Sequence, residues 1–193
     1  MNKDRKHVPI PIGSVPTLVL ALANTGKMYR PSRQAIATSF DPFTDLQATQ
    51  DLLRSWEIEG LVRETDLAQL QEVRDALQIF IRGCERHDYQ WGLALQTLNQ
   101  FATACHWVHQ LSEKGTLVEK LSGPVAAIIA ACCVTELAKL DLTRLKTCCR
   151  SECELVFYDT TRNRSAKWHA ENPCGWRARA ARSQSNERDP VDA

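Results

Sequence analysis

The sequence lacks an excess of charge of either sign. Its 193 residues include 24 lysines and arginines against 23 aspartates and glutamates. A strongly charged chain is attracted as a whole to nucleic acids, membranes or oppositely charged partners, and this near balance excludes that argument. Any charged partner must therefore be recognised by a local patch of residues.

Long hydrophobic runs are also missing. The longest, Val125 to Val134, has about half of the roughly 20 residues that a membrane-spanning helix requires. Residues 1–7 are charged, but Pro9, Pro11 and Pro16 interrupt the apolar stretch that follows, so we identify no export signal. We therefore expect a cytoplasmic protein without a membrane partner.

Motifs of several enzyme classes are absent as well. We find no glycine-rich phosphate loop, nucleophile elbow or paired-carboxylate motif. Cys105, His106 and His109 lie within five residues on an expected helix, where spacings of three and four share a face. No carboxylate of suitable spacing accompanies them, so a second metal or catalytic site competes with a partly buried polar edge. We expect the protein not to be an enzyme.

What the sequence does contain is eight cysteines. In a reducing cytoplasm, paired thiols more often hold a metal ion than form disulfides. Half of them lie in apolar, helix-like surroundings and are interpreted as core residues: Cys84, Cys105, Cys132 and Cys133. The other half fall in the last quarter of the chain: Cys148, Cys149, Cys153 and Cys174.

Apolar residues at steps of three and four predict a helical domain over residues 15–142. The short apolar segment Val15 to Ala23 leaves helix and strand open, and Ser112 to Ser122 favours a polar turn or hairpin. The expected helices run from about Leu46 to Gly60, from Thr65-Asp66 through Ile81, from Tyr89 to Leu111 and from Pro124 to Leu140.

Two close pairs of metal-ligand residue types occur in the segment that follows, residues 143–182. Cys148 and Cys153 are separated by four residues, and after a 15-residue insert His169 and Cys174 are separated by four more. Thiolate and imidazole ligands at such spacings predict one tetrahedral structural Zn2+ with no open position for hydrolytic chemistry. Cys149 is a rival to Cys148, because a three-residue spacer also allows coordination.

The same segment has few aliphatic residues, so metal binding is expected to supply most of its folding free energy. The insert has room for a hairpin turning at Thr160 to Asn163, and a helix is expected to begin at Cys174. At Gly175 the missing Cβ would let backbone amides approach the thiolate. Residues 183–193 have little to bury, which predicts a disordered tail.

The predicted fold class is therefore mainly α. A multihelical N-terminal domain is joined to a small C-terminal module, in which zinc binds a β-hairpin and a helix.

Basic residues gather in the zinc segment. One group would come from the hairpin and the other from one side of the last helix: Arg162, Arg164 and Lys167, then Arg177, Arg179 and Arg182. Such a cluster could neutralise DNA phosphates, and the alternative is a solvated face that serves solubility. Trp168 favours packing over the zinc core rather than stacking on a base, and Trp176 fits either role.

These residues resemble the CGNR zinc-finger proteins, a bacterial family with an N-terminal helical domain called ABATE. The family pattern is C-x4-C, then F-x-D-x-S/T-R-N-R-S, then W-C-x4-C-G-N-R and a basic helix. This chain matches it at Cys148, Cys153, Phe157, Asp159, Thr161, Arg162, Asn163, Arg164, Ser165, Trp168, Cys174, Gly175 and Arg177. His169 replaces a cysteine, which zinc tolerates, and Trp176 replaces an asparagine.

The N-terminal part resembles ABATE more loosely, through Leu20-x-Leu22-x-Asn24-Thr25, Leu52-Leu53-x-x-Trp56 and Arg74 with Leu77, while Ala21 stands where the family usually has aspartate. The resemblance spans about residues 15–182. It implies a transcription regulator whose finger contacts DNA and whose helical domain senses a small ligand or contacts a partner, such as a second copy. The alternative is a zinc-stabilised adaptor that binds a protein or a small ligand without DNA.

Overall fold

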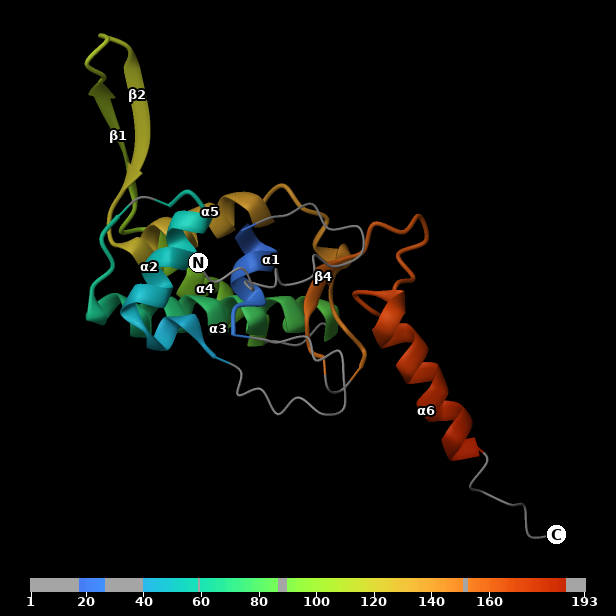
Figure 1. Ribbon diagram of the computed structural model, residues 1–193. Coiled ribbons are helices and arrows are strands. Elements are labelled where there is room, and N and C mark those ends of the chain that lie inside the picture. The colour runs from blue at the N-terminus through green and yellow to red at the C-terminus, as the bar shows by residue number, and fades with distance from the viewer. Residues whose placement is uncertain (1–17, 27–39, 59, 87–89, 151–152, 187–193) are drawn as a thin grey trace, which may run out of the picture.

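The computed structural model describes residues 18–26, 40–58, 60–86, 90–150 and 153–186, which form a helical body with two projecting elements (Figure 1). The helices are α1 (Leu18–Ala23), α2 (Leu46–Ser55), α3 (Glu64–Arg86), α4 (Gln90–Ala102), α5 (Val125–Leu137) and α6 (Trp176–Asn186). The strands form two antiparallel hairpins, β1 (His106–Leu111) with β2 (Leu117–Ser122) and β3 (Leu145–Thr147) with β4 (Val156–Tyr158). The predicted mainly helical class is confirmed.

Helix α3 is the central element of the body, in contact with α1, α4 and α5. Its residues Leu70, Val73 and Leu77 recur at steps of three and four and are fully buried, as the periodicity predicts. The helix begins at Glu64, just before the predicted cap. Asp66 therefore acts from within the first turn, where its carboxylate accepts a hydrogen bond from the Arg63 N–H at 2.8 Å.

Other helix boundaries move by a few residues. The segment Val15 to Ala23, which could have been a helix or a strand, is a helix in its described residues. The Glu136 carboxylate accepts hydrogen bonds from the N–H groups of Leu18 and Val19 in its first turn. Helix α2 ends at Ser55, before the predicted stop at Gly60. Helix α5 follows Pro124 as predicted but ends at Leu137 rather than Leu140.

The prediction of one helix from Tyr89 to Leu111 is wrong in its second half. Helix α4 ends at Ala102, and His106–Leu111 forms strand β1, paired with Leu117–Ser122. The hairpin alternative for residues 112–122 is therefore correct, with its first strand supplied by the segment predicted as helix. His106 and His109 consequently lie on a strand and not on a helical face.

Two predictions for the C-terminal segment are also corrected. The second hairpin connects β3 to β4 across residues 148–155, so it spans the first cysteine pair and does not turn at Thr160 to Asn163. The last helix begins at Trp176, after a distorted turn over Glu171–Gly175, and continues to Asn186. Residues 183–186 of the predicted tail are thus helical, and residues 187–193 lie outside the described part of the chain.

The zinc segment is docked on the helical body and shares its core. Leu145 of β3 and Val156 of β4 are 1% exposed and belong to the same apolar cluster as the helices. The buried Asn24 amide donates to the Val156 carbonyl at 2.9 Å and accepts the Val156 N–H at 2.8 Å. The expected boundary near residue 143 therefore does not separate two independent cores.

Replacing Asn24 by alanine should lower the free energy of unfolding by about 2 kcal/mol, because both backbone groups of Val156 would stay buried without a partner. Chemical denaturation of zinc-loaded protein measures this loss. Gln47→Ala is the matched control, since the Gln47 amide is exposed and, among the described residues, bonds to Asp51 alone. Its cost should stay below about 0.5 kcal/mol. Equal costs for the two variants would contradict the docking role of Asn24.

Among the described residues, no helix combines the length and the apolar character needed to cross a membrane.

Candidate metal centre

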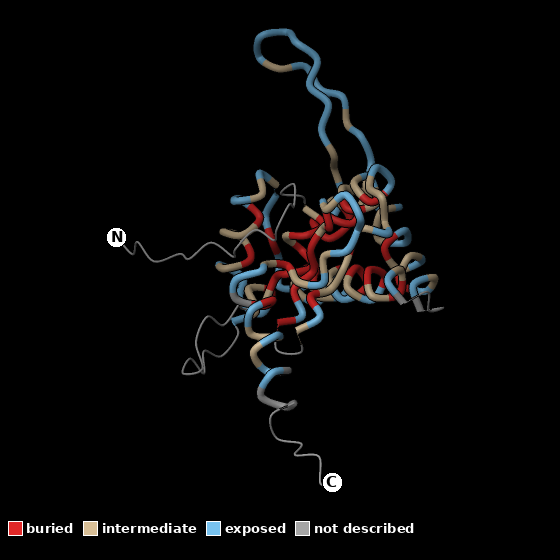
Figure 2. The backbone as a smooth tube through the Cα atoms, turned by 90° about the vertical axis from the view of Figure 1, so that its right-hand side faces the viewer, coloured by how far each residue is buried: buried red, intermediate tan, exposed pale blue. Residues whose placement is uncertain are grey.

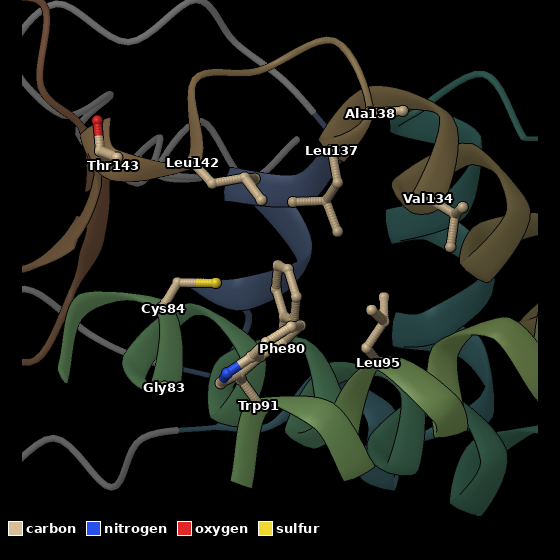
Figure 3. Close-up of a pocket in the computed structure, with 10 residues that line it drawn as sticks. All are labelled: Phe80, Gly83, Cys84, Trp91, Leu95, Val134, Leu137, Ala138, Leu142 and Thr143. Atoms are coloured by element: carbon tan, nitrogen blue, oxygen red, sulfur yellow. The ribbon is translucent and has the colours of Figure 1, made fainter. Parts of the chain in front are cut away.

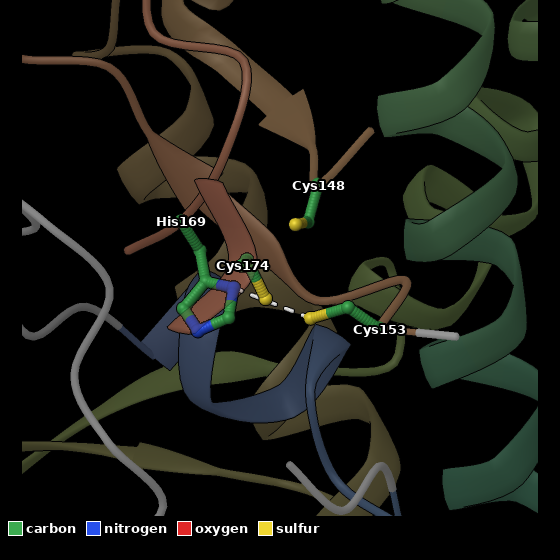
Figure 4. A group of neighbouring side chains, drawn as sticks. All are labelled: Cys148, Cys153, His169 and Cys174. Carbon is green, nitrogen blue, oxygen red and sulfur yellow. Dashed lines mark hydrogen bonds between the residues drawn. The ribbon is translucent and has the colours of Figure 1, made fainter. Parts of the chain in front are cut away.

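Four side chains from separate parts of the C-terminal segment converge on one point, as Figure 4 shows. Their ligand atoms all lie within 4.8 Å of one another, and all four residues are buried: Cys148, Cys153, His169 and Cys174. Cys148 follows β3, Cys153 precedes β4, and Cys174 lies in the turn before α6. The structure therefore brings together the four residues that the spacing predicted.

The backbone around the first cysteine pair explains why Cys148 rather than Cys149 reaches the centre. The Cys148 N–H donates to the Leu155 carbonyl at 2.8 Å, and the Cys153 N–H donates to the Arg150 carbonyl at 2.9 Å. Cys149 is exposed, and its N–H donates to the Lys167 carbonyl, which ties the first pair to the segment before His169. The alternative left open by sequence is thus resolved in favour of Cys148.

The donor set and its spacing fit zinc. A tetrahedral ion with Zn–S bonds near 2.3 Å separates its sulfur ligands by about 3.8 Å, close to the spread of this cluster. The Cys153 Sγ and His169 Nδ1 atoms are 3.2 Å apart (Figure 4), so Nδ1 is the imidazole nitrogen that faces the thiols. These four residues would hold one structural zinc ion, which supplies cross-links between the hairpin, the loop and the last helix.

The environment shifts the pKa values of the three clustered thiols in different directions. A hydrogen bond from Cys153 lowers the pKa of Cys148, which favours the thiolate form that binds a metal ion. The same hydrogen bond, followed by burial, raises the pKa of Cys153, which keeps the shared proton. Burial also raises the pKa of Cys174. A zinc ion held here would replace the protons on Cys153 and Cys174.

A small apolar shell surrounds the centre. Leu155 is fully buried with the three cysteines, and Trp168 packs against this cluster, which confirms its predicted place over the zinc core. Trp176, in contrast, is 62% exposed. Gly175 was expected to let backbone amides approach the thiolate, but its own N–H donates to the Ala170 carbonyl instead. An added Cβ at Gly175 would lie 2.8 Å from Glu171 Cδ, so the missing side chain leaves room for Glu171.

The loop between β4 and the second ligand pair is held together by one buried carboxylate. Asp159 is fully buried and accepts hydrogen bonds from Lys146 Nζ at 2.6 Å, the Thr161 hydroxyl at 2.6 Å and the Ala166 N–H at 2.9 Å. The Thr161 hydroxyl in turn accepts the Ser165 N–H. The F-x-D-x-T-R-N-R-S stretch is therefore a structural motif that fixes the loop shape, a role that pattern reading did not identify.

The predicted basic residues differ in how they are placed. Arg162 and Lys167 are exposed on the loop. Arg164 is bound to Asp141 at 3.0 Å and to the Thr143 hydroxyl. Arg179 forms an ion pair with Glu171 and stacks over Trp168 with its Cζ atom 5.6 Å from the ring centre. Two of the expected phosphate contacts thus make contacts within the protein.

The arginines of α6 do not share one side of the helix, contrary to expectation. Arg177 and Arg179 are two residues apart, and a helix turns by about 100° per residue, so they point roughly 200° apart. The side chain of Arg182 lies outside the described residues. The basic surface therefore wraps around the helix.

The second candidate cluster is not assembled. Within the described residues, no other group of three cysteine, histidine or acidic side chains lies close enough to hold a metal ion, so Cys105, His106 and His109 form no such site. His109 does have a carboxylate neighbour, which the sequence spacing did not indicate. Glu119 of β2 lies opposite His109 of β1, with its Oε1 atom 3.0 Å from the imidazole Nε2.

Comparison with known proteins supports the finger part of the resemblance. No curated protein matched the sequence. Among protein families, residues 144–187 match the family model described as CGNR zinc finger. The match begins after the helical body, so the likeness of residues 15–142 to ABATE stays a prediction. The matched segment includes all four clustered side chains. Residues 144–187 are thus similar to CGNR zinc fingers.

Proposed function

We propose that this chain is a bacterial, zinc-containing transcriptional regulator, in which the finger contacts DNA and the helical domain senses a ligand or assembles the protein. The observation that carries the proposal is a basic surface beside the metal centre. Arg162 and Lys167 are exposed on the loop, and among the described residues neither has an ion-pair partner. Exposed lysine and arginine without such partners are available to neutralise phosphates.

Helix α6 extends this basic surface away from the body. It contains three arginines and no acidic residue, and it projects from the molecule beside the loop (Figure 1). Stacking of Arg179 on Trp168 joins the first turns of α6 to the loop and, through Trp168, to the zinc core. The segment 144–187 as a whole has nine basic and five acidic residues. Zinc would thus serve to hold loop and helix in one rigid orientation toward DNA.

The double variant Arg162→Ala/Lys167→Ala tests the interface. It should weaken binding to a duplex from a random pool by about tenfold at moderate salt and reduce the log–log salt slope by about two, because two phosphate contacts are lost. Fluorescence anisotropy titrations at several salt concentrations measure both quantities. Arg54→Ala/Lys139→Ala removes the same charge from exposed residues of the helical body and should change neither.

The outcomes separate the proposal from its alternative. Equal salt slopes for the two double variants would show that the loop does not contact DNA. A wild-type protein with stoichiometric zinc that binds no duplex even at low salt would contradict DNA binding altogether and favour an adaptor.

The adaptor alternative has one observation of its own. An apolar cavity of about 430 Å³ lies between α3, α4 and α5 (Figure 3). Its lining is almost entirely hydrophobic: Phe80, Gly83, Cys84, Trp91, Leu95, Val134, Leu137, Ala138, Leu142 and Thr143. A cavity of this size and composition suits a small apolar ligand. Salt-independent binding of such a ligand, with no DNA binding, is the result that the alternative expects.

A further inference from the structure

The hairpin β1–β2 projects from the helical body and is exposed along nearly its whole length (Figures 1 and 2). Its tip is closed by a hydrogen bond from the Ser112 N–H to the Thr116 carbonyl at 2.9 Å. At its base the Gly123 backbone, with φ of +148°, lies against the Ala104 backbone. A Cβ added at Gly123 would lie 2.6 Å from the Ala104 carbonyl oxygen. The hairpin therefore leaves the body in a defined direction.

One face of this hairpin has apolar residues at both ends and a polar pair between them. Residues directly opposite in the register share a face, and faces alternate along each strand. Three opposed pairs therefore lie on one side: Trp107 with Leu121, His109 with Glu119, and Leu111 with Leu117. Trp107, Leu111 and Leu117 are 62%, 76% and 62% exposed. We name these six residues the hairpin face.

In the described part of the chain, neither strand of this hairpin contributes to the hydrophobic core, and a two-stranded hairpin without such packing is at best marginally stable in water. The three exposed side chains present on the order of 400 Å² of apolar surface, within the range of patches that mark interaction sites. Residues 106–122 include two lysines and two glutamates, so the hairpin carries no basic excess to attract nucleic acid or anionic lipid. The missing partner is therefore expected to be a protein surface.

We propose that the hairpin face binds the hairpin face of a second copy of this chain. A half-turn about an axis parallel to the strands lays β1 of one copy over β2 of the other. Trp107 and Leu111 then meet the apolar residues of the opposite strand, and His109 meets Glu119 of the second copy. The face is thus complementary to itself in both apolar character and hydrogen bonding, which is what a two-fold interface requires.

The size of the face sets the strength of this dimer. About 400 Å² of apolar surface per copy is less than the roughly 800 Å² per partner of a standard stable interface. We therefore expect a concentration-dependent dimer with a dissociation constant in the micromolar range. The proposal does not depend on DNA binding, because the hairpin and the zinc finger are separate elements.

Sedimentation velocity of the full, zinc-loaded chain from about 1 to 100 µM tests the proposal. The wild type should shift from monomer to dimer over this range, and Leu111→Asp/Leu117→Asp should weaken association at least tenfold. Gln110→Asp/Val118→Asp is the matched control, because it places the same opposed charges on the other side of the hairpin at a neighbouring position. This control should still dimerise.

Two results would overturn the proposal: a wild type that stays monomeric at about 100 µM, or equal weakening by the two double variants. Loss of fold is separated from loss of association by thermal unfolding. Because Leu111 and Leu117 are exposed, unfolding midpoints of all three proteins, extrapolated to low concentration, should coincide.

Discussion

Replacing Cys153 by serine should abolish zinc binding and release the last helix from the body. Binding free energies at four-ligand structural sites are on the order of 10 kcal/mol, and a missing thiolate removes most of this. Helix α6 has 11 residues, which is too short to be stable alone, and it is joined to the rest through the small cluster around Cys174 and Trp168. Strands β3 and β4 should persist, since Leu145 and Val156 are packed in the helical core.

Elemental analysis and hydrogen exchange measure the two parts of this result. The wild type should contain about one zinc per chain and Cys153→Ser none. Amides of residues 168–182 should lose protection while those of α3 and α5 keep it. Cys149→Ser is the matched control, because this exposed neighbouring thiol faces away from the centre, and it should retain full zinc. Stoichiometric zinc in Cys153→Ser, or its loss in Cys149→Ser, would show that the ligands are wrongly assigned.

The metal centre could be predicted from sequence because its information is local. Paired thiolate and imidazole residues at short spacings identify the ligands without knowledge of the fold. The choice between Cys148 and Cys149 could not be made that way. It depends on the register of β3 with β4, which extends to the hydrogen bond between the Cys148 N–H and the Leu155 carbonyl and turns the next side chain to solvent.

The fold was predictable where periodicity and burial agree. Helix α3 was found from Leu70, Val73 and Leu77, whose spacing fits only one local structure. Strand β1 was missed because Trp107 and Leu111 are four residues apart, a spacing that suits one face of a helix as well as one face of a strand. Pairing with Leu117–Ser122 makes this segment a strand rather than a helix. The spacing of apolar residues within the segment itself carries no information about that pairing.

The role of Asn24 was invisible for the same reason. Its side chain contacts Val156, 132 residues away, and replaces a neighbouring strand at the edge of β4. Asn24 belongs to the residues on which the predicted resemblance to ABATE rests. In the structure its side chain joins the helical body to the finger.

The buried Asp159 carboxylate leads to the second large effect. Burial alone would raise the pKa of Asp159, but hydrogen bonds from Lys146, the Thr161 hydroxyl and the N–H groups of Thr161 and Ala166 lower it to about 2. Asp159→Asn replaces one accepting oxygen by an amide that must face these donors. It also leaves the Lys146 ammonium, whose side chain is 18% exposed, without a counter-charge. Breaking a buried pair in this way costs about 3–4 kcal/mol.

Chemical unfolding at fixed free zinc measures this loss, and Asp75→Asn is the matched control. Asp75 pairs with Arg74 at 3.2 Å, but its side chain is 61% exposed, so its loss should cost less than about 1 kcal/mol. The dependence on pH has a definite sign. The pKa of Asp159 is lowered in the folded state, so its contribution is complete above the ordinary value of 3.8 and is lost as pH falls toward about 2. The gap between wild type and Asp159→Asn should therefore be constant above about pH 5 and narrow below it. A gap that stays the same down to about pH 2, or costs that are equal for the two variants, would show that the Asp159 carboxylate does not hold the loop in its folded shape.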